Sequence, residues 1–253
     1  RSRGLGDVYK RQLLISATGT GKTYASAFAM RELGFRRVLF LVHRGQLARQ
    51  TRKSYEKVFA NTVSMGLVGA GYHEYEADYV FATVQTLNRD EHLLQYAKDA
   101  FDCIVLDEAH HVPADTYRKI MDHFTPKLWL GMTATPDKRD DNVEGRNVYE
   151  IFNYQIAYEI RLQQAMEENL LCPFHYFGIT DLSMIGDEEA ARDFNMLTSD
   201  ERVRHIVNQA DYYGYSGDKV KGLIFCSNIK ETEELSAKFN QIINPATGKN
   251  FRT

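Results

Sequence analysis

The octapeptide Ser-Ala-Thr-Gly-Thr-Gly-Lys-Thr, from Ser16 to Thr23, defines more of this chain's architecture than any other segment. It follows the apolar run Leu13–Ile15, which is typical of the end of a buried strand, and a helical pattern begins at Lys22. Strand, glycine-rich loop, Lys-Thr and helix are the context in which backbone N–H groups wrap phosphate oxygens. The segment therefore predicts a phosphate-binding loop, with Ser16 at the position where the strict pattern has glycine.

Each part of the loop has an expected role in holding MgATP. Lys22 would reach the β- and γ-phosphates and take part in catalysis, and Thr23 would ligate Mg²⁺. Four residues are expected to surround the phosphates: Thr18, Gly19, Thr20 and Gly21. The following helix is expected to end at Gly34. Its predicted buried face comprises Ala25, Phe28, Ala29 and Leu33.

Two adjacent carboxylates follow another apolar run. Cys103–Leu106 is typical of a buried parallel strand, and Asp107 and Glu108 come at its carboxyl end, where open α/β sheets bind ligands. Asp107 would hold Mg²⁺, and Glu108 would orient and polarise the attacking water in phosphoryl transfer. No Cys or His lies at ligand spacing from His110, so we expect it to contact the Thr133–Thr135 loop rather than zinc.

Apolar runs alternate with helical patterns along the chain, as parallel βαβ units require. The predicted fold class is therefore α/β, with a doubly wound, mostly parallel sheet. Its expected strands are Leu13–Ile15, Val38–Val42, Val80–Ala82, Cys103–Leu106, Leu128–Met132 and Asn153–Ile160. Further along, Phe174–Ile179 and Lys221–Cys226 are expected strands, and Thr198–Glu201 is predicted to be a capping box that opens a helix.

The order of these motifs resembles superfamily II helicases of the DEAD/DEAH-box kind, and in particular the branch related to the helicase subunit of type III restriction enzymes. The resemblance runs from about Leu13 to about Ile243. The matching segments, in the order of motifs I, Ia, the next strand-contacting motif, II, III and IV, are Ser16–Thr23, Val42–Leu47, Phe81–Leu87, Asp107–His110, Gly131–Pro136 and Gly222–Ser227.

This resemblance implies a RecA-like P-loop NTPase that hydrolyses MgATP to move along nucleic acid, with DNA favoured over RNA. It implies an ATP-binding domain at residues 13–165 and a truncated second RecA-like domain at 166–253. The implied nucleic-acid contacts are Arg44, Thr83, Gln85 and Thr86. The implied coupling residues are His110, Thr133 and Thr135. A nuclease or a restriction or repair module is the implied protein partner.

Nothing after motif IV resembles motifs V and VI, the second of which supplies the arginine finger in the family. We therefore expect a fragment of a longer protein that hydrolyses ATP slowly. Residues 1–12 resemble a sequencing-adapter read-through and are expected to be a non-native leader.

The chain has 253 residues and a net charge of −3, which does not by itself indicate a nucleic-acid partner. However, seven Lys or Arg and a single acid lie between Arg36 and Lys57. Arg44 follows a predicted strand and could hold a backbone phosphate without base specificity. A helix that begins near Gly45 would expose much of this charge. Its predicted buried residues are Leu47, Tyr55, Val58 and Phe59.

Three widely spaced cysteines, Cys103, Cys172 and Cys226, are expected to be reduced, as in a cytoplasmic protein. No apolar run approaches the ~18 residues of a membrane span. Two other functions fit the same motifs. One is a translocase that moves on duplex DNA without unwinding it, and the other is a nucleotide-gated nucleic-acid-binding module with no motor activity.

Overall fold

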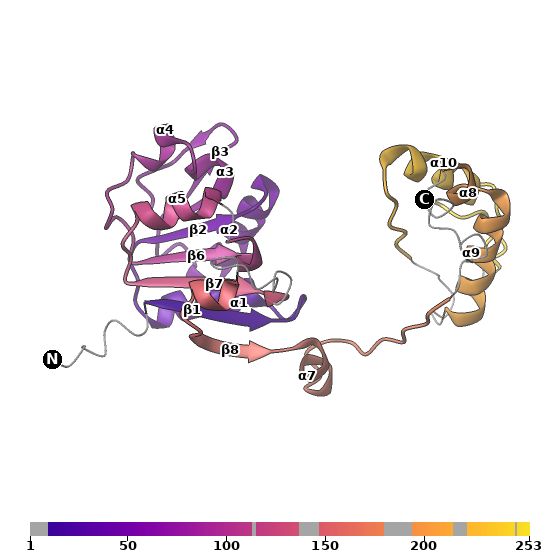
Figure 1. Cartoon of the computed structure of the whole chain (residues 1–253), viewed down its shortest axis with the longest axis horizontal. Coiled ribbons are helices and arrows are strands. Elements are labelled where there is room, and N and C mark those ends of the chain that lie inside the picture. The colour runs from indigo at the N-terminus through magenta and orange to yellow at the C-terminus, as the bar shows by residue number, and fades with distance from the viewer. Residues whose placement is uncertain (1–9, 113–114, 137–146, 180–193, 215–221, 246) are drawn as a thin grey trace. The chain divides into compact units, whose positions relative to one another are not determined.

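The computed structural model describes residues 10–112, 115–136, 147–179, 194–214, 222–245 and 247–253 (Figure 1). The chain forms two units, of which the first ends at Pro173 and the second begins at Phe174. The predicted boundary between residues 165 and 166 falls inside helix α7 (Leu162–Glu167). Residues 1–9 of the predicted leader lie outside the described residues.

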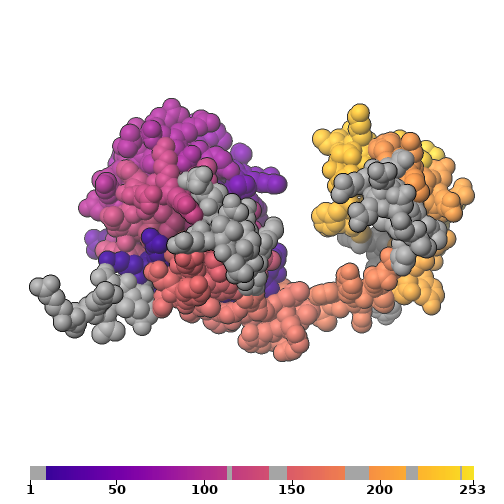
Figure 2. Space-filling model, in the orientation of Figure 1, coloured from indigo at the N-terminus to yellow at the C-terminus, as the bar shows by residue number. Residues whose placement is uncertain are grey.

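Helix α7 belongs to the first unit because its apolar side is buried there. Ala165 is fully buried and forms a small cluster with Ala17 and Ile160, against which Leu171 packs. The rest of α7 lies at the surface (Figure 2), and Leu162, Gln163 and Gln164 are exposed. The segment after the last strand therefore closes over the start of the phosphate-binding loop.

An eight-stranded sheet organises the first unit, in the order β4-β3-β5-β2-β6-β7-β1-β8. All neighbouring strands are parallel except β3 and β4. The predicted mostly parallel α/β sheet is thus confirmed. The strands are β1 (Arg11–Ser16), β2 (Val38–Val42), β3 (Met65–Gly69), β4 (Tyr72–His73), β5 (Tyr79–Thr83), β6 (Cys103–Asp107), β7 (Leu128–Thr133) and β8 (Ile156–Ile160).

Strand β1 begins two residues earlier than predicted. Arg11 is paired with Trp129, and Gln12 with Leu130. Parallel pairing with β7 extends the strand into residues 11 and 12, which the sequence had assigned to the leader.

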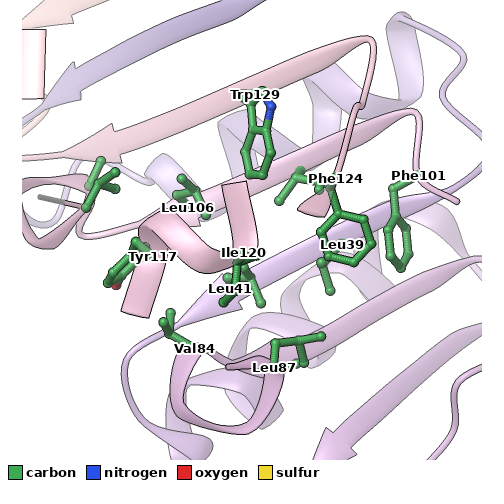
Figure 3. Close-up of a cluster of buried hydrophobic side chains, with 14 of the residues drawn as sticks. Leu39, Leu41, Val84, Leu87, Phe101, Leu106, Tyr117, Ile120, Phe124 and Trp129 are labelled. Carbon is green, nitrogen blue, oxygen red and sulfur yellow. The ribbon is translucent and has the colours of Figure 1, made fainter. Parts of the chain in front are cut away.

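Helices cover both faces of the sheet, because successive strand side chains point to opposite faces. Phe40 packs edge-on against Tyr55 of α2 (Gly45–Phe59) on one face. Leu41 points to the other face and shares a cluster with Tyr117 of α5 (Figure 3). The helices of this unit that precede α7 are α1 (Lys22–Glu32), α2 (Gly45–Phe59), α3 (Val84–Leu87), α4 (Asp90–Leu93), the 3-10 turn η2 (Ala109–His111), α5 (Asp115–His123) and α6 (Val148–Ile151).

The β3–β4 hairpin was not predicted, because its apolar run is short and contains two glycines. A signal was nevertheless present. Ala70 and Gly71 connect the strands with φ values of 52° and 87°, the left-handed pair that favours glycine in two-residue hairpin turns.

The predicted buried face of α1 is wrong. Phe28 and Leu33 are 45% and 58% exposed, whereas Ser26, Ala27 and Met30 are buried. The apolar pattern of this helix is weak. The side that faces the sheet is therefore set by the preceding loop and by the hydrogen bonds of Ser26 to Thr23 and Tyr55. Gly34 does follow the helix with φ of 66°, as its predicted end requires.

Helix α2 begins at Gly45, as predicted, and buries Tyr55 and Phe59. Leu47, however, is exposed, and Ala48 and Thr51 are buried in its place.

The second unit contains α8 (Phe194–Leu197), α9 (Asp200–Tyr213) and α10 (Ile229–Phe239). Its cluster is Val203, Val207, Leu235 and Phe239. The predicted capping box at Thr198–Glu201 is wrong, because the helix begins one residue later and Arg202 stands where a capping box needs Glu or Gln. Ser199, not Thr198, caps α9 and accepts a hydrogen bond from the Arg202 N–H at 3.3 Å. Thr198 instead donates to the Phe194 carbonyl at 2.8 Å, because it still belongs to the turn that ends α8.

The two strands predicted in the second unit are wrong over their described residues. Phe174–Ile179 and residues 222–226 have no paired neighbour, and a single bridge, Ile243 to Asn250, is the only strand pairing among the described residues of this unit. Phe225 is 92% exposed, because an extended segment buries its side chains only beside other strands. The predicted truncated second RecA-like domain stays a prediction.

Candidate functional site

The loop between β1 and α1 holds two glycines in left-handed conformations. Gly19 has φ of 90° and Gly21 has φ of 85°, values that residues with a Cβ rarely adopt. A Cβ at Gly19 would also lie 3.1 Å from the Leu171 side chain. Gly21 caps α1, whose first N–H groups have no partner within the helix and therefore favour an anion. This is the backbone geometry of a phosphate cradle.

Ser16, the departure from the strict motif, is accommodated inside this loop. Its hydroxyl hydrogen-bonds to the Thr20 hydroxyl. Thr20 in turn donates to the Ala17 carbonyl at 2.7 Å, so Ser16 is the donor of the first bond. The serine side chain therefore links the start of the loop to its middle, a contact that glycine could not make.

Lys22 lies between the loop and the carboxylates of β6. Its Nζ donates to the Ser16 and Ala17 carbonyls at 2.9 and 3.3 Å. Desolvation lowers the pKa of Lys22, while Glu108 and Asp107 act in the opposite direction through their charges. Two motifs more than eighty residues apart in sequence are thus within electrostatic reach of each other.

Asp107 is the last residue of β6. Burial raises the pKa of Asp107 to about 6, with the Glu108 charge as the second cause. The Glu108 N–H, which donates to Asp107 Oδ1 at 3.1 Å, and Lys22 offset part of this shift. A half-buried carboxylate with a raised pKa is a favourable ligand for a bound cation.

Glu108 adopts φ and ψ of 53° and 52°, an unusual conformation for a residue with a Cβ. Such strain costs about 1–3 kcal/mol and gathers at functional sites. His110 Nδ1 lies 3.3 Å from Glu108 Oε2 and 3.0 Å from Thr133 Oγ1. The Thr135 N–H donates to the same Thr133 oxygen at 3.1 Å. The predicted contact between His110 and the Thr133–Thr135 loop is therefore present.

Sequence reasoning missed the support behind Thr23. Ser26 donates to the Thr23 carbonyl at 2.8 Å, and its Oγ lies 2.8 Å from the Tyr55 hydroxyl. Tyr55 is fully buried, and burial raises the pKa of its hydroxyl. A hydrogen-bonded path from α2 therefore fixes the first turn of α1, which carries Thr23.

We expect Tyr55→Phe to lower the free energy of unfolding by about 1–2 kcal/mol, since it leaves buried Ser26 without this donor. Tyr117→Phe is the matched control. The Tyr117 hydroxyl is buried without a hydrogen-bond partner among the described residues, so its removal should be neutral or stabilising. Denaturant unfolding of both variants checks this. Equal losses in the two variants would contradict the role of the Ser26–Tyr55 bond.

The four predicted nucleic-acid contacts lie at the carboxyl ends of two neighbouring strands. Val42 of β2 is in register with Thr83 of β5, and Arg44 and Gln85 follow these residues. Thr83 caps α3 by accepting a hydrogen bond from the Thr86 N–H at 3.2 Å. The structure thus brings the predicted contacts to the edge that also carries the phosphate loop and Asp107.

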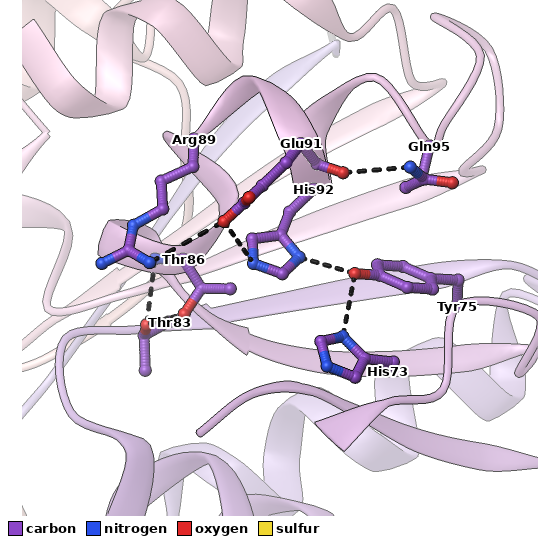
Figure 4. Close-up of polar contacts among 8 residues, drawn as sticks. All are labelled: His73, Tyr75, Thr83, Thr86, Arg89, Glu91, His92 and Gln95. Carbon is purple, nitrogen blue, oxygen red and sulfur yellow. Dashed lines mark hydrogen bonds and ion pairs between the residues drawn. The ribbon is translucent and has the colours of Figure 1, made fainter. Parts of the chain in front are cut away.

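A polar pocket of about 560 Å³ lies beside Gln85 and Thr86. The Tyr75 hydroxyl lies 2.6 Å from His92 Nδ1 and 3.2 Å from His73 Nδ1 at its wall (Figure 4). The complete lining is Gly69, Ala70, Gly71, His73, Tyr75, Gln85, Thr86, Arg89, Glu91 and His92.

The basic segment does not form one patch. Arg36 and Arg37 precede β2 and lie at the amino ends of the strands. Their backbone N–H groups donate to Asp102 Oδ2 there. Arg52 is paired with Glu56 at 2.8 Å. Arg44, in contrast, is exposed at the carboxyl edge.

Comparison with solved structures supports a RecA-like P-loop domain as the class that this fold and loop define. The type ISP restriction-modification enzyme LlaBIII bound to DNA aligns with a TM-score of 0.61 at 19% identity, covering 96% of this chain and 21% of that one. A fragment of a putative HsdR subunit of a type I restriction enzyme from Vibrio vulnificus aligns with a TM-score of 0.60 at 19% identity, covering 93% of this chain and 43% of that one. At such identities the likeness establishes the fold alone.

The chain belongs to the family described as "Type III restriction enzyme, res subunit", which matches residues 5–138, more than half of its length. A type I restriction enzyme EcoAI endonuclease subunit of Escherichia coli is 28% identical over 89% of this chain. A putative ATP-dependent helicase IRC3 of Saccharomyces cerevisiae is 27% identical over 70% of it. The chain spans 31% and 27% of these two relatives. No helix within the described residues has the length and apolarity to cross a membrane.

Proposed function

We propose that this chain is the ATP-hydrolysing part of a helicase or translocase that moves along DNA. The observation that carries the proposal is that the glycine loop after β1 and the Asp107–Glu108 pair after β6 lie at the same carboxyl edge of the parallel sheet, with Lys22 within electrostatic reach of both acids. Family membership and relatives named as ATP-dependent helicases and restriction enzyme subunits support the same activity. The expected cytoplasmic location stays a prediction.

The residues present fit MgATP. The positive-φ glycines and the start of α1 suit phosphate oxygens. Thr23 and Asp107 offer the hydroxyl and carboxylate oxygens that Mg²⁺ prefers. When bound, the metal would neutralise charge on the transferred phosphoryl group. The Lys22 ammonium, which now donates to the Ser16 and Ala17 carbonyls inside the loop, would exchange these partners for phosphate oxygens.

Glu108 is the proposed general base. Its carboxylate is part-exposed, so a water molecule can reach it, and its left-handed backbone fixes the direction of the side chain. The carboxylate would accept the proton of the attacking water as the water oxygen bonds to the γ-phosphorus, while the bond from that phosphorus to the β–γ bridging oxygen breaks and ADP leaves. The neighbouring His110 can then hydrogen-bond to the carboxyl group.

Duplex translocation without unwinding is the second candidate, because restriction enzyme subunits occur among the relatives. Two assays on the same protein separate the candidates. Displacement of a strand from a partial duplex supports unwinding. Displacement of the third strand of a triplex, without strand separation, supports translocation alone. ATP-dependent activity in neither assay would favour the nucleotide-gated binding module.

Arg44→Ala should weaken single-strand binding several-fold for all sequences and reduce the salt slope of log K by about 1, as one lost phosphate contact predicts. Arg36→Ala is the matched control, because it removes the same charge from the opposite edge of the sheet. Fluorescence anisotropy at several salt concentrations measures both quantities. A base-selective loss, or equal losses in the two variants, would contradict the phosphate contact at Arg44.

A further inference from the structure

Three adjacent strands place three polar side chains in a row along the carboxyl edge. The strand order β5-β2-β6 puts Gln85 after the first strand, His43 after the second and His111 shortly after the third. Gln85 belongs to the proposed DNA contacts, while His111 ends the turn that starts beside Glu108. The row therefore begins at the proposed DNA contacts and ends at the turn beside Glu108, where MgATP is proposed to bind.

Each step along this row is a direct contact. Gln85 Nε2 donates to His43 Nδ1 at 3.4 Å. The His43 ring stacks on the His111 ring, with centroids 5.1 Å apart and planes 21° from parallel. The His111 N–H donates to the Glu108 carbonyl at 2.9 Å. These contacts link the His43 ring to the backbone of Glu108.

The contact pattern does not indicate a metal centre or a folding role. Within the described ranges, no group of three or more His, Cys, Asp or Glu side chains is arranged to hold a metal ion. His43 is exposed, so its ring adds little buried surface to the core. The η2 turn is instead anchored by Ala109 and His110, which are both buried.

We propose that the His43–His111 stack couples DNA binding to the position of Glu108. The inference rests on the proposed function and adds two positioning residues to it. DNA bound at Arg44 and Gln85 would hold the end of β2 and the start of α3, and with them the His43 ring. Because the rings move together, the η2 turn and Glu108 are held in the orientation that hydrolysis requires.

The test is single-turnover hydrolysis of MgATP by the full-length protein that contains this chain, with and without saturating single-stranded DNA. His43→Ala and His111→Ala should each lower the stimulation by DNA about 5-fold to 150-fold, the range of typical coupling between two sites. Hydrolysis without DNA, and the separate affinities for ATP and DNA, should change by less than about twofold. The double variant should be no worse than either single variant, because both changes break one stack.

Two further variants distinguish the stack from a general effect on structure. His43→Phe keeps a ring against His111 and should retain more stimulation than His43→Ala. His123 is a half-buried histidine in the last turn of α5, and its Nε2 lies 3.0 Å from the Tyr96 carbonyl oxygen. His123→Ala should leave the stimulation by DNA intact.

The outcomes also separate this inference from the proposed function. A full-length wild-type protein that binds MgATP but is not stimulated by DNA contradicts the proposed function itself. A stimulated wild type whose stimulation survives in His43→Ala and His111→Ala overturns the coupling role. Equal loss of hydrolysis with and without DNA would assign these histidines a purely structural role. Additive losses in the double variant would show that the two histidines act independently rather than as one stack.

Discussion

Lys22→Ala is expected to abolish measurable MgATP turnover while the fold stays intact. The ammonium makes charge-assisted contacts with phosphate oxygens that strengthen as negative charge moves during transfer, and the loss of one such group costs about 10²–10³-fold in rate. ATP affinity should also fall, by about 10- to 100-fold. Calorimetric titration and a phosphate-release assay measure the two effects.

Folding of this variant should be unaffected, because the hydrogen bonds of Lys22 Nζ within the described residues go to the Ser16 and Ala17 carbonyls alone. Lys57→Ala, which removes an exposed lysine at the end of α2, is the charge control and should keep full affinity. A folded Lys22→Ala protein with wild-type turnover would contradict the assignment of this loop.

Glu108→Gln should separate ATP binding from hydrolysis. Nucleotide affinity should stay near that of the wild type, because Asp107, Thr23 and the loop are unchanged. Turnover should fall by about 10²–10⁴-fold, since a carboxamide cannot accept the proton of the attacking water. Rapid-quench measurement of the hydrolysis step, together with equilibrium binding of MgATP, gives both numbers.

The backbone of Glu108 provides a second readout. Glu108→Gly and Glu108→Ala both remove the carboxylate, but only glycine relieves the left-handed conformation. The glycine variant should therefore be more stable than the alanine variant by about 1 kcal/mol. Normal turnover in Glu108→Gln, or lost ATP binding with normal turnover per bound ATP, would show that Glu108 is not the base.

The chemistry of the site was accessible from sequence because it depends on local patterns. The glycines before Lys22 predict a phosphate loop, and the apolar run before Asp107 predicts a buried strand that ends in acids. Strand direction then places both at one edge. These inferences need only the alternation of strands and helices, and the structure brings Lys22 within reach of Asp107 and Glu108 accordingly.

Contacts that depend on which strands are neighbours in the sheet could not be predicted from the sequence. Nothing in the sequence states that β2 lies between β5 and β6, so the stack of His43 on His111 could not be predicted. The prediction of the buried face of α1 was wrong for a related reason. Its buried face is set by the bond between Ser26 and Tyr55, which lie on different helices.

The second unit shows the same limit for strands. The apolar run that includes Leu223 and Phe225 has the composition of a buried strand, yet both side chains are largely exposed. Strand propensity expresses fit to a sheet surface rather than a preference of the isolated segment. Without a paired neighbour among the described residues, the run remains extended.

The central claim is that the loop before Lys22 and the Asp107 carboxylate form a site for MgATP. The most direct test is a titration of the wild-type chain with ATP, first with Mg²⁺ and then with excess chelator, at pH values from 5 to 8. The account predicts a single saturable site that needs Mg²⁺. Its affinity should fall as the pH drops through about 6, because protonated Asp107 no longer offers a carboxylate to the metal. Above that pH the affinity should level off. No saturable binding, or binding that is indifferent to both Mg²⁺ and pH, would contradict the assignment of the site.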